Sequence, residues 1–165
     1  MDGILLIDKP QGWTSHDVVA KVRNLLKVKK IGHTGTLDPM ATGLLVLCVG
    51  RATKFVKYLT EHDKVYSAEI GLGIQTDSDD ITGRVINKQS VEPIDSLKIV
   101  SVLNTFIGKS MQVPPVASAI KVDGKRAYQF IHKNQELPEM TARPIELYRL
   151  DLIEDPYFID ETLRL

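Results

Sequence analysis

The sequence predicts an α+β fold, with a mixed, mainly antiparallel sheet flanked by helices. Three observations support this prediction. Residues 4–7 and 44–49 are short apolar runs bounded by turn residues, as in strands. Residues 14–26 and 95–107 place their apolar side chains at the spacing of an amphipathic helix. No repeat, linker or low-complexity segment interrupts the 165 residues, so we expect one domain.

The N-terminal elements follow from apolar spacing and turn residues. A strand over 4–7 ends at the turn formed by residues 9–12, Lys-Pro-Gln-Gly. Thr14 or Ser15 then caps a helix. The shared apolar face of this helix consists of Val18, Val19, Val22, Leu25 and Leu26. The run 44–49 predicts a buried strand, and 52–59 has the composition of a short helix.

The elements after residue 60 are predicted from alternation and from helix caps. Residues 65–74 alternate, which predicts a long strand with Tyr66 on its apolar face. A polar loop at 77–82 leads into a strand at 84–86. Asp95 or Ser96 can cap a helix whose inward side chains are Leu97, Val100, Leu103, Phe106 and Ile107. Later strands are expected at 111–113, 118–122, 145–153 and 158–165, with a tight turn at Asp123-Gly124 and a helix at 127–132.

Composition excludes several classes of protein. The chain is 43% hydrophobic and 25% charged, which is ordinary for a folded globular domain. Its first residues lack the basic segment of an export signal, and no apolar run approaches the ~20 residues of a membrane span. The single cysteine, Cys48, cannot form an internal disulfide. We therefore expect a cytoplasmic protein with no membrane association.

Charge is segregated along the chain, although the formal net charge is zero. Residues 21–30 carry five Lys and Arg residues and no acid, whereas 61–84 carries six acids against two bases. A second basic stretch, 109–133, has five bases and one acid. This distribution can present a basic face to phosphate groups, and a solvated mixed surface explains the same counts.

Metal and nucleotide sites have little support in the sequence. The four histidines and the one cysteine show none of the spacings of zinc ligands. Residues 77–80, Asp-Ser-Asp-Asp, begin like a calcium loop, but Ile81 and Gly83 break its register. Residues 71–73, Gly-Leu-Gly, lack the third glycine of a dinucleotide site, and no GxxxxGK phosphate loop is present. We expect no metal, no nucleotide and no other cofactor.

The most informative candidate site is the segment 33–43, which reads HTGTLDPMATG. Gly35 and Gly43 permit backbone angles that are closed to other residues, and Pro39 keeps Asp38 out of the helical region. The buried strand that follows anchors the loop on its C-terminal side. Asp38 is therefore either a turn former, with its carboxylate bonded to nearby backbone N–H groups, or a rigidly held nucleophile.

Other segments surround this loop in a definite order. Residues 5–15 read LLIDKPQGWTS and residues 63–68 read DKVYSA. Gly83, PPVASAIK at 114–121 and GKRAY at 124–128 follow. Together with the HxGxLDPxATG loop, these segments resemble the bacterial tRNA pseudouridine-55 synthase family (TruB) over nearly the whole chain. The resemblance implies a pseudouridine-synthase-like fold and isomerisation of uridine 55, in the T loop of tRNA, to pseudouridine without a cofactor.

The resemblance also implies roles for residues around the loop. Asp38 is the nucleophile, and a carboxylate suits this role because it is ionised near pH 7 and is both a covalent nucleophile and a good leaving group. The target base must leave its stack. Tyr66 then lies against the flipped base, where its hydroxyl can help to remove the ring proton, and His33 fills the gap left in the RNA. Lys9 lines the pocket. Each of these residues also has a purely structural interpretation. Tyr66 can be a core residue, His33 can be bonded to local backbone in its loop, and Lys9 can stabilise its own turn with Asp8.

More distant residues receive roles in the same way. The resemblance makes Asp80 a second carboxylate that orients an arginine, whereas the residue by itself reads as solvated. Lys121, Lys125 and Arg126 surround the Asp-Gly turn. They are either simple surface charge or part of an insertion that closes over the T stem-loop of tRNA. We expect the chain to act on tRNA as a monomer.

The last residues of the chain carry a further expectation. Residues 161–165 alternate polar and apolar, as in a strand whose neighbour is missing. In the resembled family the chain continues through a basic segment, with an arginine that pairs with the catalytic aspartate, into a small RNA-binding (PUA) domain. We therefore expect residues 1–165 to be the N-terminal portion of the catalytic domain, with low activity.

Two other functions fit the same residues. The first is a non-catalytic RNA-binding or RNA-folding module. The second is a hydrolase that uses Asp38 and Asp80 as a pair of carboxylates, in the manner of glycosidases. Only isomerisation through C5 expels the hydrogen of the uracil ring, so release of that hydrogen separates the three hypotheses.

Overall fold

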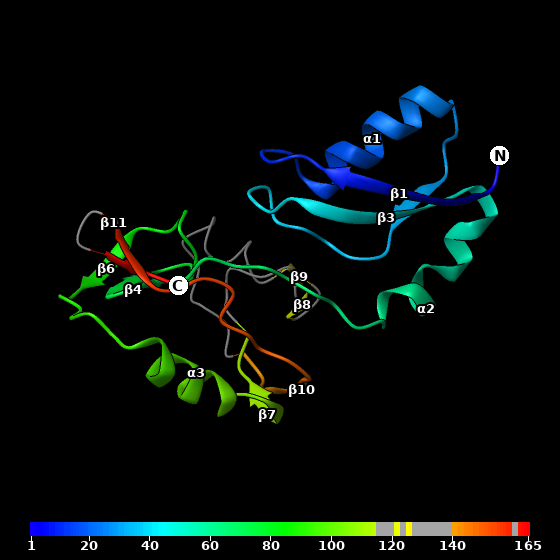
Figure 1. The fold of residues 1–165 in the computed structure, drawn as a ribbon. Helices are drawn as coiled ribbons and strands as arrows, with labels where there is room; N and C mark the ends of the chain where they lie inside the picture. The colour runs from blue at the N-terminus through cyan, green and yellow to red at the C-terminus, as the bar shows by residue number, and fades with distance from the viewer. Residues whose placement is uncertain (115–120, 123–124, 127–139, 160–161) are drawn as a thin grey trace. The chain divides into compact units, whose positions relative to one another are not determined.

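Figure 1 shows the computed structural model, which describes residues 1–114, 121–122, 125–126, 140–159 and 162–165. The chain divides into two compact units, Met1–Tyr66 (unit 1) and Ser67–Leu165 (unit 2). Every strand pair that the structure describes is antiparallel. No helix in the described part of the chain is long and apolar enough to cross a membrane.

Unit 1 is built on a three-stranded sheet with the order β1-β3-β2. Its strands are β1 (Gly3–Lys9), β2 (Ile31–His33) and β3 (Gly43–Val49). In the register, Leu5 pairs with Leu47 and Ile31 pairs with Val49. The two apolar runs expected to be strands are therefore neighbours in one sheet.

The core of unit 1 lies between this sheet and helix α1 (Ser15–Leu26), which covers one face of β1 and β3 (Figure 1). Alternate residues of β3 point toward the helix, because successive side chains of a strand face opposite ways. The buried cluster consists of Val18, Val19, Val22, Ile31, Leu45, Leu47 and Val49. Fully burying each such aliphatic side chain contributes about 1.5–3 kcal/mol. This packing fixes the ends of the loops that connect the strands.

Helix α1 begins as the sequence predicts. Thr14 is the N-cap, and its side-chain oxygen accepts a hydrogen bond from Asp17 N at 3.0 Å, while the Asp17 carboxylate accepts one from Thr14 N at 2.9 Å. Ser15 is therefore not needed as the cap. At the other end, Leu25 is 68% exposed, so its predicted place in the buried face is wrong. The helix ends at Lys27, whose left-handed φ of 55° stops the helical backbone.

The predicted short helix at 52–59 is present in two pieces. A 3₁₀ helix η1 (Gly50–Phe55) passes into helix α2 (Val56–Thr60). On the sheet face away from α1, Cys48 is fully buried and pairs with Gly32. A Cβ on Gly32 would lie 3.7 Å from Val56 Cγ2, so α2 covers this end of the sheet.

In its described residues, unit 2 consists of short strands and one helix. The strands are β4 (Gly71–Leu72), β5 (Ile74–Thr76), β6 (Val85–Lys88), β7 (Gly108–Gln112), β8 (Lys121–Val122), β9 (Lys125–Arg126), β10 (Arg143–Leu147), β11 (Tyr157–Ile159) and β12 (Thr162–Arg164). They form the sheets β11-β12-β4, β5-β6, β10-β7 and β8-β9. The helix is α3 (Ser96–Asn104), and its N-cap Asp95 accepts a hydrogen bond from Leu97 N at 2.8 Å, which confirms the predicted cap.

Four predictions for unit 2 and the segment leading into it are wrong. The long strand at 65–74 is absent, since residues 63–70 are irregular and only β4 and β5 follow. The strand expected at 145–153 stops at Leu147, and the one expected at 158–165 is a hairpin of β11 and β12. The predicted inward face of α3 is also wrong, because Leu97 is 77% exposed and the buried residue is Ile99.

The strand at the end of the chain has neighbours on both sides. β12 pairs with β11 and with β4, and Thr162 is buried. The expectation that a neighbouring strand is missing here is therefore wrong. The elements expected at 118–120, 123–124 and 127–132 lie outside the described residues.

Candidate active-site loop

The candidate nucleophile lies in the loop between β2 and β3, residues 34–42. The loop leaves β2 with a hydrogen bond from Thr34 N to Val46 O at 3.0 Å. It enters β3 through Gly43, whose φ of +109° is a conformation that residues with a side chain rarely adopt. Within the loop, Ala41 N donates to Asp38 O at 3.1 Å, which closes a turn over residues 38–41 with Pro39 and Met40 at its centre. The Asp38 side chain itself is exposed.

On the C-terminal side of Asp38, the loop is fixed through the carbonyl of Pro39. This oxygen accepts hydrogen bonds from Gly12 N at 2.7 Å and from Lys9 Nζ at 3.3 Å. The Lys9 ammonium also donates to Pro10 O at 3.1 Å and Trp13 O at 2.7 Å. Lys9 is fully buried, and its three N–H donors match these three backbone carbonyls. The turn after β1 is thus joined to the Asp38 loop by a buried charge.

On the N-terminal side, Leu37 is fixed by the first residue of α1. Ser15 Oγ accepts a hydrogen bond from Leu37 N at 2.9 Å and donates one to Leu37 O at 3.2 Å. The Leu37 side chain packs against the core of unit 1. Both neighbours of Asp38 are therefore held by the β1–α1 segment, while the carboxylate stays open to solvent. Such a carboxylate can attack a bound molecule or take a proton from it.

His33 stands where the loop begins. It is the last residue of β2, it is half-buried, and it pairs with Leu47. Its ring lies edge-on to that of His16 from α1, with the ring centres 5.4 Å apart and the planes at 64°. His33 thus directly precedes the Asp38 loop, and Lys9 contacts that loop through Pro39 O.

Tyr66 has a different setting from the predicted one. It lies in the irregular segment at the end of unit 1 and is 69% exposed, rather than on the apolar face of a strand. Its neighbour Val65 is 98% exposed. Among the described residues, no hydrogen bond or ring contact joins Tyr66 to Asp38.

Asp80 closes the loop between β5 and β6 in unit 2. Its Oδ1 accepts hydrogen bonds from the Thr82 hydroxyl at 2.6 Å, Thr82 N at 2.7 Å and Ser78 Oγ at 2.8 Å. The hydrogen bond from the Thr82 hydroxyl is the main reason that the pKa of Asp80 lies below its usual value. A Cβ on Gly83 would collide with Ser78 Oγ, so the loop needs glycine there. Asp80 thus has a structural role in its own loop.

The three basic residues of the predicted insertion lie on a hairpin. Lys121 pairs with Arg126, and Val122 pairs with Lys125. The two residues between these strands, Asp123 and Gly124, lie outside the described part of the chain.

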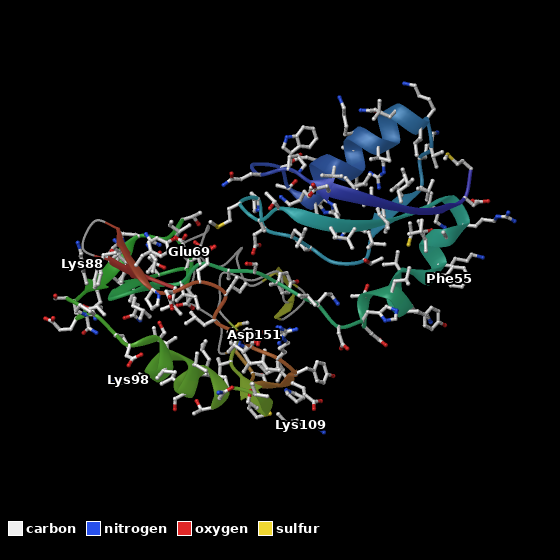
Figure 2. All side chains as sticks on the ribbon, viewed as in Figure 1. Phe55, Glu69, Lys88, Lys98, Lys109 and Asp151 are labelled. Carbon is white, nitrogen blue, oxygen red and sulfur yellow. The ribbon has the colours of Figure 1, made fainter. Side chains whose placement is uncertain are left out.

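Two groups of polar residues were not singled out by sequence patterns. From the sequence, Ser15 is only an alternative N-cap for the helix, and its hydrogen bonds to Leu37 are not predicted. The one hint in the sequence is that Thr14 can cap the helix by itself, which leaves the Ser15 hydroxyl available for another contact. The other group joins segments far apart in the sequence. Tyr157 OH donates to Glu69 Oε2 at 2.8 Å, and Arg164 Nη1 lies 3.4 Å from Glu69 Oε1 (Figure 2 labels Glu69). This hydrogen bond to the Glu69 carboxylate raises the pKa of Tyr157.

Comparison with known families now identifies the chain. The sequence profile described as "TruB family pseudouridylate synthase (N terminal domain)" matches residues 23–160, which include the Asp38 loop and the β8-β9 hairpin. The chain belongs to the TruB family. The resemblance seen in the sequence motifs is therefore confirmed.

Individual TruB-family relatives agree with this assignment. A protein named tRNA pseudouridine synthase B from Clostridium kluyveri is 50% identical over 159 residues, which are 95% of this chain and 54% of the relative. One of the same name from Bacillus subtilis is 51% identical over 138 residues, which are 83% of this chain and 45% of the relative. The chain thus spans about half the length of the curated relatives it matches.

A solved structure supports the fold. A chain from the crystal structure of a Cbf5-Nop10-Gar1 complex matches 98% of this TruB-family chain with a TM-score of 0.56 and 25% sequence identity. The match covers 38% of that chain. The predicted class, helices with a mainly antiparallel sheet, is confirmed.

Proposed function

We propose that the protein isomerises uridine to pseudouridine in tRNA, at position 55 of the T loop, with Asp38 as the nucleophile. The observation that carries the proposal is the Asp38 loop, in which both neighbours of an exposed carboxylate are hydrogen-bonded to the β1–α1 segment. The names of the relatives, tRNA pseudouridine synthase B, support both the reaction and the class of substrate.

The reaction can be balanced with the residues at hand. The target uridine leaves its stack, and the Asp38 carboxylate forms a covalent bond to the nucleoside. The bond between the ribose and N1 of the base breaks, the base turns, and C5 bonds to the ribose. The hydrogen on C5 then leaves as a proton, N1 gains one, and the carboxylate departs. No oxidant, metal or cofactor is needed in this scheme.

Other residues receive proposed roles around this step. Tyr66 contacts the extruded base and helps to remove the C5 proton, and His33 fills the gap that the base leaves. Lys9, beneath the loop, forms part of the pocket wall. In unit 2, Asp80 takes part as a second carboxylate, and Lys121, Lys125 and Arg126 bind the T stem-loop. The protein acts as a monomer in the cytoplasm, where tRNA is found.

The proposed domain organisation is that residues 1–165 form the N-terminal portion of the catalytic domain, with low activity. The supporting fact is that the chain spans about half the length of its relatives. Activity is therefore best measured under single-turnover conditions with saturating RNA.

The test measures tritium release from T stem-loop RNA that contains [5-³H]uridine. The chain should release tritium, and Asp38→Asn should slow the release by about a thousandfold or more, as expected when a covalent nucleophile is lost. The melting temperature of Asp38→Asn should equal that of the wild type, because the Asp38 carboxylate is exposed. The matched control is Asp8→Asn, which removes another exposed carboxylate of unit 1 and should keep full activity.

Each alternative has its own outcome in this assay. RNA binding without tritium release would favour a non-catalytic RNA-binding module. Liberation of free uracil would favour a hydrolase. Substantial turnover by Asp38→Asn would show that another group is the nucleophile.

A further inference from the structure

The hydroxyl of Ser15 has no part in starting helix α1. Thr14 is the N-cap, and its side chain forms a reciprocal pair of hydrogen bonds with Asp17. Ser15, the next residue, is buried, with only 2% of its surface exposed. A buried serine in the first turn of a helix needs a partner for its hydroxyl, and the structure provides one outside the helix.

That partner is the residue before the proposed nucleophile. Ser15 Oγ accepts from Leu37 N at 2.9 Å, and its single O–H donates to Leu37 O at 3.2 Å. The two bonds involve consecutive peptide groups, one on each side of the Leu37 α-carbon. The second of these peptide groups ends at the nitrogen of Asp38. Holding both groups restricts φ and ψ of Leu37 and fixes the peptide plane that contains the nitrogen and α-carbon of Asp38, from which the carboxylate projects.

The other contacts of the loop leave the backbone before Asp38 to be fixed by the hydrogen bonds between Ser15 and Leu37. The Leu37 side chain packs against the core of unit 1, and Pro39 O is held by Gly12 N and Lys9 Nζ. Asp38 has no side-chain hydrogen bond among the contacts of the described residues, so its direction depends on the backbone around it. Ser15 controls the N-terminal half of that backbone.

We propose that Ser15 is a positioning residue for Asp38, through its paired hydrogen bonds with Leu37. The proposal rests on the proposed function for its catalytic consequence, while the restraint on the loop can be measured without any reaction. Small losses of alignment at a reacting group slow an enzyme by about ten- to a hundredfold. Loss of the Ser15 hydroxyl should therefore lower kcat by that factor and leave KM for RNA nearly unchanged.

The experiment compares Ser15→Ala with Thr14→Ala in the full chain. Alanine fits the space of serine and favours a helix, so Ser15→Ala should fold. Thr14→Ala removes the cap of the same helix without touching Leu37, and it controls for a weakened α1. Amide hydrogen exchange is followed by NMR at Leu37 and Asp38. Tritium release from T stem-loop RNA gives kcat and KM.

The expected result is exchange at Leu37 at least about tenfold faster in Ser15→Ala, with kcat lowered and KM kept, and neither change in Thr14→Ala. Unchanged exchange in Ser15→Ala would overturn the proposal, and so would faster exchange with unchanged kcat. An equal loss of kcat in Thr14→Ala would also overturn it, since the effect would then come from the helix. A wild-type chain without tritium release would contradict the proposed function, and the exchange data alone would then decide whether Ser15 restrains the loop.

Discussion

A buried ammonium with no carboxylate partner among the described residues lies beneath the Asp38 loop. The turn after β1 and the Asp38 loop both direct backbone carbonyls at Lys9, which is fully buried. Three oxygens replace the water that the charge loses on folding. Because one oxygen comes from a residue 30 positions away, Lys9 ties two distant segments together.

Lys9→Met tests this arrangement at the residue scale. Methionine keeps the length of the side chain but leaves the carbonyls of Pro10 and Trp13 without their donor. We expect the free energy of unfolding to fall by about 1–3 kcal/mol, the usual cost of leaving buried polar groups unsatisfied. Urea denaturation measures this change. Lys54→Met, at an exposed lysine of η1, should change it by less than about 0.5 kcal/mol, and an equal loss in both variants would contradict the structural role of Lys9.

The sequence predicts a stiff turn around Asp38 but not the contacts that hold it. The fixed φ of Pro39 and the unusual backbone angles open to Gly43 predict a stiff turn. The structure has a hydrogen-bonded turn at residues 38–41 and a φ of +109° at Gly43. The hydrogen bonds from Lys9 to Pro39 and from Ser15 to Leu37 join residues more than 20 positions apart, and local spacing carries no information about such pairs. The resemblance to the TruB family implied that Lys9 lines the pocket, but it did not imply that the Lys9 ammonium is buried among backbone carbonyls.

The element that depends most on a titratable group is the loop between β5 and β6. Three donors from Ser78 and Thr82 converge on Asp80 Oδ1. These bonds favour the ionised carboxylate, and the pKa of Asp80 is accordingly below the ordinary value of 3.8, chiefly because of the Thr82 hydroxyl. A depressed pKa in the folded state gives stability that is present above pH 3.8 and is lost as the pH falls through the lower, folded pKa.

Asp80→Asn should therefore flatten the acid limb of the stability curve. At pH 6 the variant should melt below the wild type, and the difference should shrink as the pH falls below about 4, because the wild-type carboxylate then gains its proton. Melting temperatures across this range provide the measurement. Asp79→Asn is the matched control, since Asp79 takes no part in these bonds and asparagine tolerates its φ of 59°. A constant gap between wild type and Asp80→Asn at all pH values would refute the linkage.

Secondary structure was predicted correctly where the apolar residues of a segment are the ones that are buried, and wrongly where they are exposed. The continuous apolar runs that became β1 and β3 form the sheet that packs against helix α1, so the prediction of buried strands matches their packing. Residues 65–70 alternate too, yet Val65 is almost fully exposed and no strand forms. Helix α3 was found from its cap, but Ile99 is buried in place of Leu97, because the partner that covers a helix decides which apolar residues are buried.

The whole chain carries its charges unevenly between its two units. Unit 1 has ten Lys and Arg residues against six Asp and Glu, whereas unit 2 has eleven against fifteen. The formal net charge of zero is therefore the sum of a basic unit 1 and an acidic unit 2. Phosphate contacts depend on local charge, so RNA binding by this chain should weaken steeply as salt rises.

Charge reversal on the β8-β9 hairpin tests which bases meet the RNA. The double variant Lys125→Glu/Arg126→Glu should reduce the slope of log affinity against log salt by about 0.7 to 0.9 for each phosphate that the hairpin no longer neutralises. The control reverses Lys98 and Lys109, exposed on α3 and β7 of the same unit (Figure 2), and changes the net charge equally. Fluorescence anisotropy with T stem-loop RNA gives both slopes. Equal slopes for the two double variants would place the RNA elsewhere.

The single cysteine gives this chain a built-in reporter of opening. Cys48 is the only thiol in the sequence, it is fully buried in β3, and burial raises its pKa. A thiol reagent can reach it only when the sheet of unit 1 separates from α2 or from its neighbouring strands. The rate of labelling in the native protein therefore reports the opening of unit 1 around Cys48. The same measurement can rank variants of the Asp38 loop without RNA, without a reaction and without attaching a foreign probe.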